Sequence, residues 1–194
     1  MEISIRDPRT QNAAEVSDLF RLKTESVTQD EGKLAASLGH AYNLNTGNIT
    51  LTNATKTPVM FLKNTGDVDL LVDKIFFILG SSTGGSGNLF IEVVRNPLAG
   101  TIVTNAVAVS MNSNRNFGSN NTIAANAYKG ATGNTMTDGT DSLGTIATAS
   151  NTIVVDAGST ILKKGSSIGI NFTAPVGNTS MIAQFALSIY EKTI

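Results

Sequence analysis

The sequence predicts an all-β protein built as an antiparallel β-sandwich, and three observations support this fold class. From Ala41 onward, short apolar runs with a period of two are separated by turns rich in Gly, Asn and Asp. No helical pattern longer than about two turns interrupts these runs. The connections between the last runs are too short for a crossover helix, so the strands should pair antiparallel. Both a jelly-roll and an immunoglobulin-like sandwich fit this pattern.

Residues 1–40 differ from the rest of the chain because they hold a disproportionate share of its charged side chains. This composition fits a flexible tail. It also fits an ordered arm that leaves the domain and lies on a neighbouring subunit, and we favour the arm. We therefore expect an extended N-terminal arm over residues 1–40 and a β-sandwich domain over residues 41–194. The expected anchors of the arm are its apolar side chains, Leu19, Phe20, Leu22, Val27, Leu34 and Leu38.

The first strands of the domain are expected at residues 48–52 and 59–63, and the next run, Leu70 to Leu79, is the most apolar strand candidate. Strict alternation divides this run into two largely apolar faces. One face would hold Leu71, Asp73, Ile75, Phe77 and Leu79, and the other Leu70, Val72, Lys74, Phe76 and Ile78. Either the strand is covered on both sides, or one face contacts neighbouring subunits. In the second case the expected contact residues are Leu70, Val72, Phe76 and Ile78.

The glycine-rich segment 80–87 is predicted to be a hairpin tip, because the lysine and helix that a phosphate-binding loop requires do not follow it. Residues 88–95 would be the return strand, and residues 101–109 a further strand. Residues 110–150 are either an irregular functional surface or hide a pair of short strands, and residues 130–144 within them are loop-like in composition. The final strand candidates are residues 152–155, 160–162, 167–172 and 181–190.

The composition argues against catalysis, because the residue types that titrate, attack or ligate are scarce. The chain has no cysteine and one histidine, and charged residues make up 15% of it. Thiolate zinc sites, disulfides and cysteine nucleophiles are therefore excluded. His40 alone makes no catalytic site, since neither a nucleophile nor an orienting acid can be placed beside it. We expect a non-enzymatic protein with no catalytic residues, no cofactor and no metal.

Two carboxylate pairs are weaker candidates for a site. Asp138 and Asp141 lie in a turn-like segment, where a solvated turn is favoured over a calcium ion because the spacing does not match an EF-hand. Asp73 and Glu92 would approach each other only if their strands pair, and the aromatic platforms of sugar sites are scarce. The formal net charge of −1 argues against nucleic acid and anionic membranes as partners. No apolar run reaches the roughly 18 residues that span a bilayer.

Three motifs within residues 18–100 carry a resemblance to a known group of proteins. They are DLFRL at residues 18–22, YNLNTGNITLT at residues 42–52 and FLKNTGDVDLLV at residues 61–72. The first lies in the charged N-terminal segment, and the other two lie in the predicted strands that follow it. Together these structural residues resemble a group of tailed-bacteriophage virion proteins.

The resemblance implies a β-sandwich of the jelly-roll type and a location in the phage particle, on the outer surface of the head. The implied role is that of a head decoration (cement or auxiliary) protein, which binds the major capsid protein as a homotrimer and stabilises the shell. Such proteins carry no catalytic residues, so none is transferred to this chain. A carbohydrate- or host-surface-binding module of a phage fibre or tail is the alternative function, because jelly rolls often serve as lectins.

Overall fold

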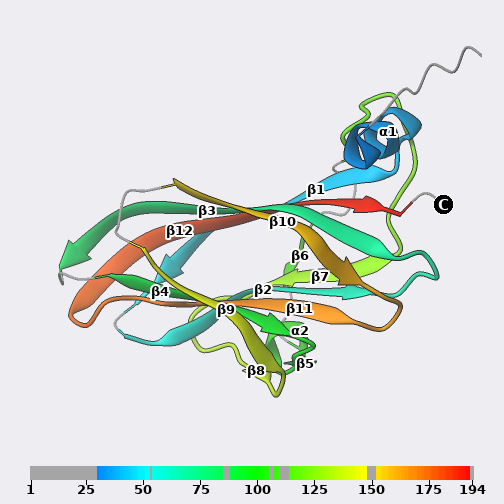
Figure 1. Cartoon of the computed structure of the whole chain (residues 1–194). Coiled ribbons are helices and arrows are strands. Elements are labelled where there is room, and N and C mark those ends of the chain that lie inside the picture. The colour runs from blue at the N-terminus through cyan, green and yellow to red at the C-terminus, as the bar shows by residue number, and fades with distance from the viewer. Residues whose placement is uncertain are drawn as a thin grey trace, which may run out of the picture. The chain divides into compact units, whose positions relative to one another are not determined.

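Two antiparallel β-sheets pack face to face in the computed structural model, so the predicted all-β sandwich is confirmed (Figure 1). The structure describes residues 30–52, 54–84, 88–104, 107–109, 114–147 and 152–192. The described residues from Glu31 onward belong to one compact unit. The predicted arm anchors Leu19, Phe20, Leu22 and Val27 lie outside the described residues.

The smaller of the two main sheets has four strands, and neighbours in it are hydrogen-bonded. Its order is β1 (Ala41–Leu51), β12 (Asn178–Glu191), β3 (Leu70–Gly84) and β10 (Thr152–Leu162). The central pair, β12 and β3, is long and is interrupted by several register shifts. The helix α1 (Glu31–Leu38) precedes β1 and contacts the β1 and β12 strands.

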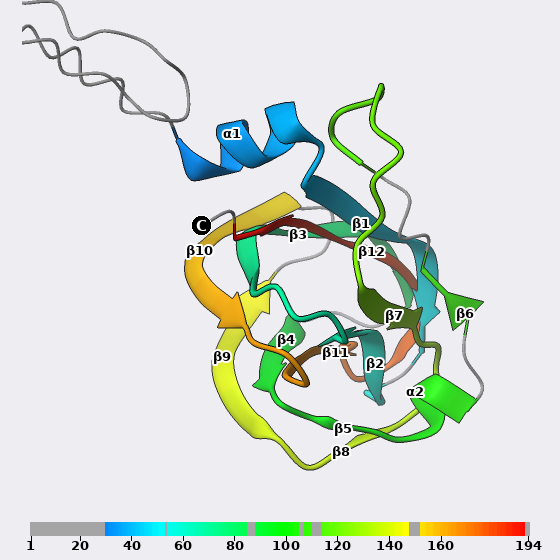
Figure 2. The same cartoon turned by 90° about the vertical axis from the view of Figure 1, so that its right-hand side faces the viewer.

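The larger sheet has six strands. Its order is β6 (Val107–Ala108), β7 (Ala125–Lys129), β2 (Lys56–Asn64), β11 (Ser167–Thr173), β4 (Leu89–Arg95) and β9 (Thr140–Ala147). A two-stranded ribbon of β5 (Leu98–Ala99) and β8 (Met136–Thr137) and the short helix α2 (Thr101–Thr104) complete the described elements. Figure 2 shows α1 beside the four-stranded sheet, and β5, β8 and α2 beside the six-stranded sheet.

Successive long strands mostly cross from one sheet to the other. β1 and β3 lie in the four-stranded sheet, whereas β2 and β4 lie in the six-stranded sheet. The prediction of a hairpin tip at residues 80–87 was therefore wrong: residues 80–84 continue β3, and β4 begins in the opposite sheet. Local glycine content signals a change of direction but does not specify which sheet receives the next strand.

A β-bulge in β3 changes which of its side chains face the core. Along β12, the consecutive residues Ser188 and Ile189 pair with Lys74 and Val72, so Asp73 has no opposite partner. Before the bulge the side chains of Leu70 and Val72 point into the core, and after it the buried ones are Ile75, Phe77 and Leu79. The predicted grouping of Leu70 and Val72 with Phe76 and Ile78 on one face was therefore wrong, because one extra residue reverses the alternation.

The segment 101–109 also differs from its predicted single strand. Its first four residues form α2, and among its other described residues Val107 and Ala108 pair with β7. Thr135 supports the helix, because its carbonyl accepts from Ile102 N–H and its hydroxyl accepts from Thr101 N–H. Ile102 is fully buried. Packing and these long-range hydrogen bonds outweigh the strand preference of a Thr-Ile-Val run.

Residues 130–144 contain short strands, so the prediction of a loop there was wrong and the alternative of hidden short strands fits better. β8 and β9 are joined by Asp138 and Gly139, which both have positive φ, 53° and 89°. These two residues bend a continuous ladder and do not reverse the chain, because β9 pairs with β4 and β8 pairs with β5, with Arg95 opposite Thr140 and Leu98 opposite Thr137. β7 lies earlier in the stretch 110–150 and adds a further short strand there.

Three phenylalanines connect the two sheets at the centre of the core. The ring of Phe77 on β3 lies 5.5 Å from that of Phe185 on β12, and 5.9 Å from that of Phe172 on β11 of the opposite sheet. All three side chains are buried. Tilted aromatic contacts of this kind add to the stabilisation that comes from area burial.

We expect Phe77→Ala to lower the free energy of unfolding by about 3–5 kcal/mol, because it removes a large buried ring and leaves a cavity between the sheets. Urea denaturation followed by circular dichroism measures this loss. Phe117→Ala is the matched control, since Phe117 is fully exposed, and its effect should stay within about 0.5 kcal/mol. Equal effects of the two substitutions would contradict the placement of Phe77 in the core.

Candidate interaction surface

The outer face of the four-stranded sheet carries an exposed apolar cluster. Val154 lies directly opposite Phe76 on the neighbouring strand, and Ile78 lies two residues further along β3. Ile182 on β12 alternates with the buried Met181 and Ala183 and therefore points outward. The exposed fractions are 37% for Ile78, 46% for Ile182 and 53% for Val154, and Phe76 is half-buried. These four side chains are called the outer patch below: Phe76, Ile78, Val154 and Ile182.

The helix α1 covers the opposite end of the same sheet. Ala35, with Ala36 beside it, packs against Leu71 and Tyr190 in a small apolar cluster separate from the main core. The helix ends at Gly39, whose φ is +78°. Gly39 N–H donates to the Ala36 carbonyl and His40 N–H donates to the Ala35 carbonyl, which satisfies the last turn. At one end of the four-stranded sheet, α1 therefore covers the outer face. At the other end, the outer face is apolar and exposed.

A polar cluster fixes the junction between α1 and β1. His40 Nδ1 lies 2.6 Å from Glu191 Oε2, and Glu191 N–H donates to the His40 carbonyl. The amide of Asn114 donates to the Gly39 carbonyl over 2.7 Å. Burial raises the pKa of Tyr42 to about 12, and the negative charge of Glu191 adds to this effect. We call His40, Tyr42, Asn114 and Glu191 the polar junction.

Part of the outer face of the six-stranded sheet, in contrast, is covered by the chain's own segments. Gly169 on β11 lies between the inward-facing Ile168 and Ile170, so it faces outward. A Cβ atom at Gly169 would lie 2.8 Å from the side chains of Met136 and Pro97, which is too close for any larger residue. The β5–β8 ribbon therefore presses directly on this face, and the outer patch has no counterpart beside Gly169.

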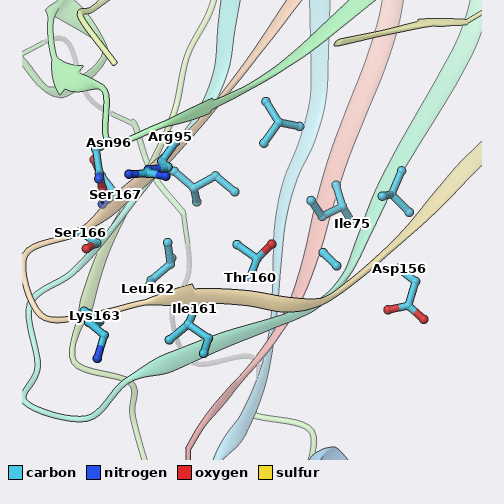
Figure 3. A pocket seen from close by; sticks show the side chains of 14 residues that line it. Ile75, Arg95, Asn96, Asp156, Thr160, Ile161, Leu162, Lys163, Ser166 and Ser167 are labelled. Carbon is cyan, nitrogen blue, oxygen red and sulfur yellow. Dashed lines mark hydrogen bonds between the residues drawn. The ribbon is translucent and has the colours of Figure 1, made fainter. Parts of the chain in front are cut away.

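A cleft of about 530 Å³ opens between the two sheets beside β10. Its floor is apolar and includes Ile75, Val93 and Ile168. Figure 3 shows Arg95 at one end of the cleft, next to Asn96 and Ser167, and Asp156 at the other end. The wall around Asn96 is held by two contacts: Ser167 N–H donates to the Asn96 side-chain oxygen, and Ser167 Oγ donates to the Pro97 carbonyl.

Two lysines near this cleft are paired with aspartates. Lys163 Nζ lies 3.6 Å from Asp69 Oδ2, and Lys164 Nζ donates to Asp67 Oδ1. The hydrogen bond and the charge of Lys164 hold the pKa of the Asp67 carboxyl below its usual range. For Arg95, in contrast, no carboxylate partner exists among the residues that the structure describes.

The structure places the predicted contact residues in three different environments. Phe76 and Ile78 lie in the outer patch, whereas Leu70 and Val72 are buried in the core and have no exposed side-chain surface to offer a neighbour. The β3 bulge is the reason for this correction. In α1, the predicted arm anchor Leu34 is half-buried and Leu38 is 53% exposed.

Sequence reasoning did not assign Val154 and Ile182 to a contact surface. The alternation around Ile182 was visible, but only the pairing of β12 with β3 and of β10 with β3 brings these residues to one place. Strand order is set by contacts between distant segments, which a single sequence does not display.

Asp73 and Glu92 do not meet as a pair. Asp73 Oδ2 lies 3.7 Å from Arg115 Nη1, whereas Glu92 Oε2 lies 2.8 Å from Lys56 Nζ within the six-stranded sheet. β3 and β4 belong to different sheets, so Asp73 and Glu92 do not lie on paired strands. Within the described residues no group of three His, Cys, Asp or Glu side chains is placed to hold a metal ion. None of the helices in that part of the chain is long and apolar enough to cross a membrane.

Comparisons of this chain with family models and with curated proteins give no match, and one with solved structures gives a weak alignment. No family model matches it, and no curated protein matches its sequence. Among solved structures it aligns with the infectious bursal disease virus VP2 subviral particle, at 9% sequence identity and a TM-score of 0.19. The alignment covers 79% of this chain and 41% of the VP2 chain, so this chain spans less than half of that protein.

We expect stability to decrease above pH 10 because of Tyr42. The unfolded tyrosine releases its proton near its ordinary pKa of 10, whereas the folded protein retains it until about pH 12. Between these values proton release favours the unfolded state, so the free energy of unfolding falls as the pH rises, by about 2 kcal/mol. Urea denaturation as a function of pH measures the slope.

Tyr42→Phe should flatten this slope, because phenylalanine has no proton to release. Tyr128→Phe is the control, since Tyr128 lies on β7 in the opposite sheet and stacks on Phe61. The interpretation fails if Tyr42→Phe and the wild type lose stability equally between the two pH values.

The pair His40–Glu191 should couple α1 to the end of β12. A double-mutant cycle of His40→Asn and Glu191→Gln is expected to give a coupling energy of about 1 kcal/mol, since the carboxylate is largely buried. The same cycle on Lys164 and Asp67, which are both mostly exposed, should give a smaller value. If the coupling energy of His40–Glu191 does not exceed that of Lys164–Asp67, the His40–Glu191 contact does not stabilise the attachment of α1 to β12.

Proposed function

We propose that this protein is a non-enzymatic structural subunit of a virus particle, a decoration or cement protein on the outer head surface of a tailed phage. In this role it binds the major capsid protein, associates with copies of itself as a trimer and stabilises the shell. The observation that carries the proposal is the outer patch. Its four apolar side chains lie on neighbouring strands and are at least partly exposed to solvent in the isolated chain. Exposed apolar clusters of this kind mark protein contact surfaces.

The strand order supports the jelly-roll part of the proposal. The sheet β1-β12-β3-β10 faces a sheet in which four successive strands are ordered β2-β11-β4-β9. Eight strands that alternate in this way between two sheets correspond to two interleaved Greek keys, the jelly-roll arrangement. Jelly rolls build many virus shells and many lectins, so the fold alone favours neither of these functions.

The position of the outer patch favours a structural role over sugar binding. The four side chains lie on three adjacent hydrogen-bonded strands, and only Phe76 is aromatic. A backbone held in a sheet loses little freedom on association, so the apolar area buried there, at about 25 cal/mol per Å², mainly has to offset the lost translational and rotational freedom of the subunits. Cement proteins act in this mechanical way, by adding buried contact area between capsid subunits.

The solution mass of the purified protein tests the self-association on which the proposal depends. Multi-angle light scattering is expected to give three times the chain mass of 20.2 kDa. Replacing Val154 and Ile182 together by Asn should shift the mass toward that of the monomer, because it places polar groups in the contact. Deleting residues 1–30, which keeps α1, measures the contribution of the predicted arm separately.

Phe90→Asn is the matched control for the outer patch. Phe90 is also an apolar strand residue and is 40% exposed, but it lies on β4 of the six-stranded sheet. It should leave the trimer unchanged. A monomeric wild type, or a trimer that resists the Val154 and Ile182 substitutions, would overturn the proposed contact. A monomer that binds a sugar on a glycan array would favour the alternative, a carbohydrate- or host-surface-binding module.

A further inference from the structure

The cleft beside β10 is independent of the outer patch and has a different chemistry. It lies between the sheets, whereas the outer patch lies on the outside of one of them. It opens where the pairing of β10 with β3 is interrupted, because the register shifts between Asp156 and Thr160. β10 is the edge strand of its sheet, so no further strand of the described residues closes the cleft on that side of the sheet.

The cleft has an apolar floor that reaches the main core. Ile75 on β3, Val93 on β4 and Leu162 on β10 line it, and all three belong to the buried cluster between the sheets. Val155 and Ala157 pack against the same cluster from β10 and are half-buried. A volume of about 530 Å³ with these walls lies in the range of pockets that bind small molecules.

Arg95 is positioned to hold an anion at one end of this cleft. It follows the inward-facing Ile91 and Val93 at alternate positions of β4, so it projects from the inner face at the last residue of the strand. Figure 3 shows its guanidinium group at the end of the cleft beside Asn96. The nearby Lys163 is paired with Asp69, whereas Arg95 has no carboxylate partner among the described residues.

We propose that this cleft binds a single-chain aliphatic carboxylate, with the hydrocarbon chain along the apolar floor and the carboxylate on Arg95. Guanidinium and carboxylate groups form two parallel hydrogen bonds, which is the geometry that an unpaired arginine at the end of an apolar cleft favours. Arg95 lies at one end of the cleft and the rest of the floor is apolar, so the ligand has one acidic group and an apolar tail. The site is separate from the proposed assembly contact and does not depend on it.

Isothermal titration of the full chain with dodecanoate, below the concentration at which it forms micelles, tests the proposal. Saturable binding of one molecule per chain is expected. Dodecanol, which has the same chain without the charge, should bind at least about tenfold more weakly, because it lacks the charge-assisted hydrogen bonds. Acetate, which has the charge without the chain, should not bind measurably.

Two substitutions locate the site. Arg95→Gln should weaken dodecanoate binding by about tenfold or more and leave dodecanol binding unchanged. Ala157→Leu should weaken the binding of both compounds, because it fills part of the cleft. Ile182→Asn is the control for nonspecific binding to the outer patch and should bind dodecanoate as the wild type does.

Three results would overturn the proposal: no saturable binding by the wild type, equal affinity for dodecanoate and dodecanol, or loss of binding in Ile182→Asn but not in Arg95→Gln. The last result would place the ligand on the outer patch. Because Arg95→Gln changes an exposed side chain, its fold can be checked by circular dichroism before titration. None of these outcomes depends on the mass of the assembly, so failure here is distinguishable from failure of the proposed structural role.

Discussion

The β-bulge at Asp73 is the constraint on which the two faces of the four-stranded sheet depend. Residues on a strand alternate between the two faces of the sheet. One unpaired residue therefore turns every later side chain of the strand to the face opposite the one that strict alternation predicts. On the N-terminal side of the bulge the outward residue is Leu71, which α1 covers. On the other side the outward residues are Phe76 and Ile78, which remain without cover from the described residues. The same bulge directs Ile75 and Phe77 to the core.

The covered end of this face is organised by a helix terminus. Gly39 adopts a left-handed backbone that ends α1, and its Cβ position lies within 2.6 Å of Ser119, so no larger residue fits without movement of that segment. The side-chain amide of Asn114 and the pair His40–Glu191 then connect the turn to the loop after β6 and to β12. Because these contacts join segments far apart in sequence, the described end of the N-terminal region is part of the domain surface.

Much of the fold could be predicted from sequence, because its signals are local. Alternating apolar residues identified β11 and β12. The Asp-Gly pair at residues 138–139 suggests a turn but only bends the ladder that β8 and β9 form with β5 and β4. The bulge in β3 and the one-turn helix at Thr101–Thr104 could not be predicted. Both depend on partners distant in sequence, Ser188 and Ile189 for the bulge and Thr135 for the helix. For the same reason sequence identified half of the outer patch, the part on β3, and missed Val154 and Ile182.

The two sheets differ in how their outer faces are covered, and this difference is the strongest structural argument for an interaction surface. On the six-stranded sheet, Gly169 allows Met136 and Pro97 to lie against the strand, so the chain covers part of that face with its own ribbon. On the four-stranded sheet, α1 covers only the end at Leu71 and Tyr190. Phe90 on the six-stranded sheet is also partly exposed, so exposure alone does not distinguish the outer patch. The patch is distinguished by four apolar side chains that adjoin on three paired strands, and this arrangement is the basis of the proposed assembly contact.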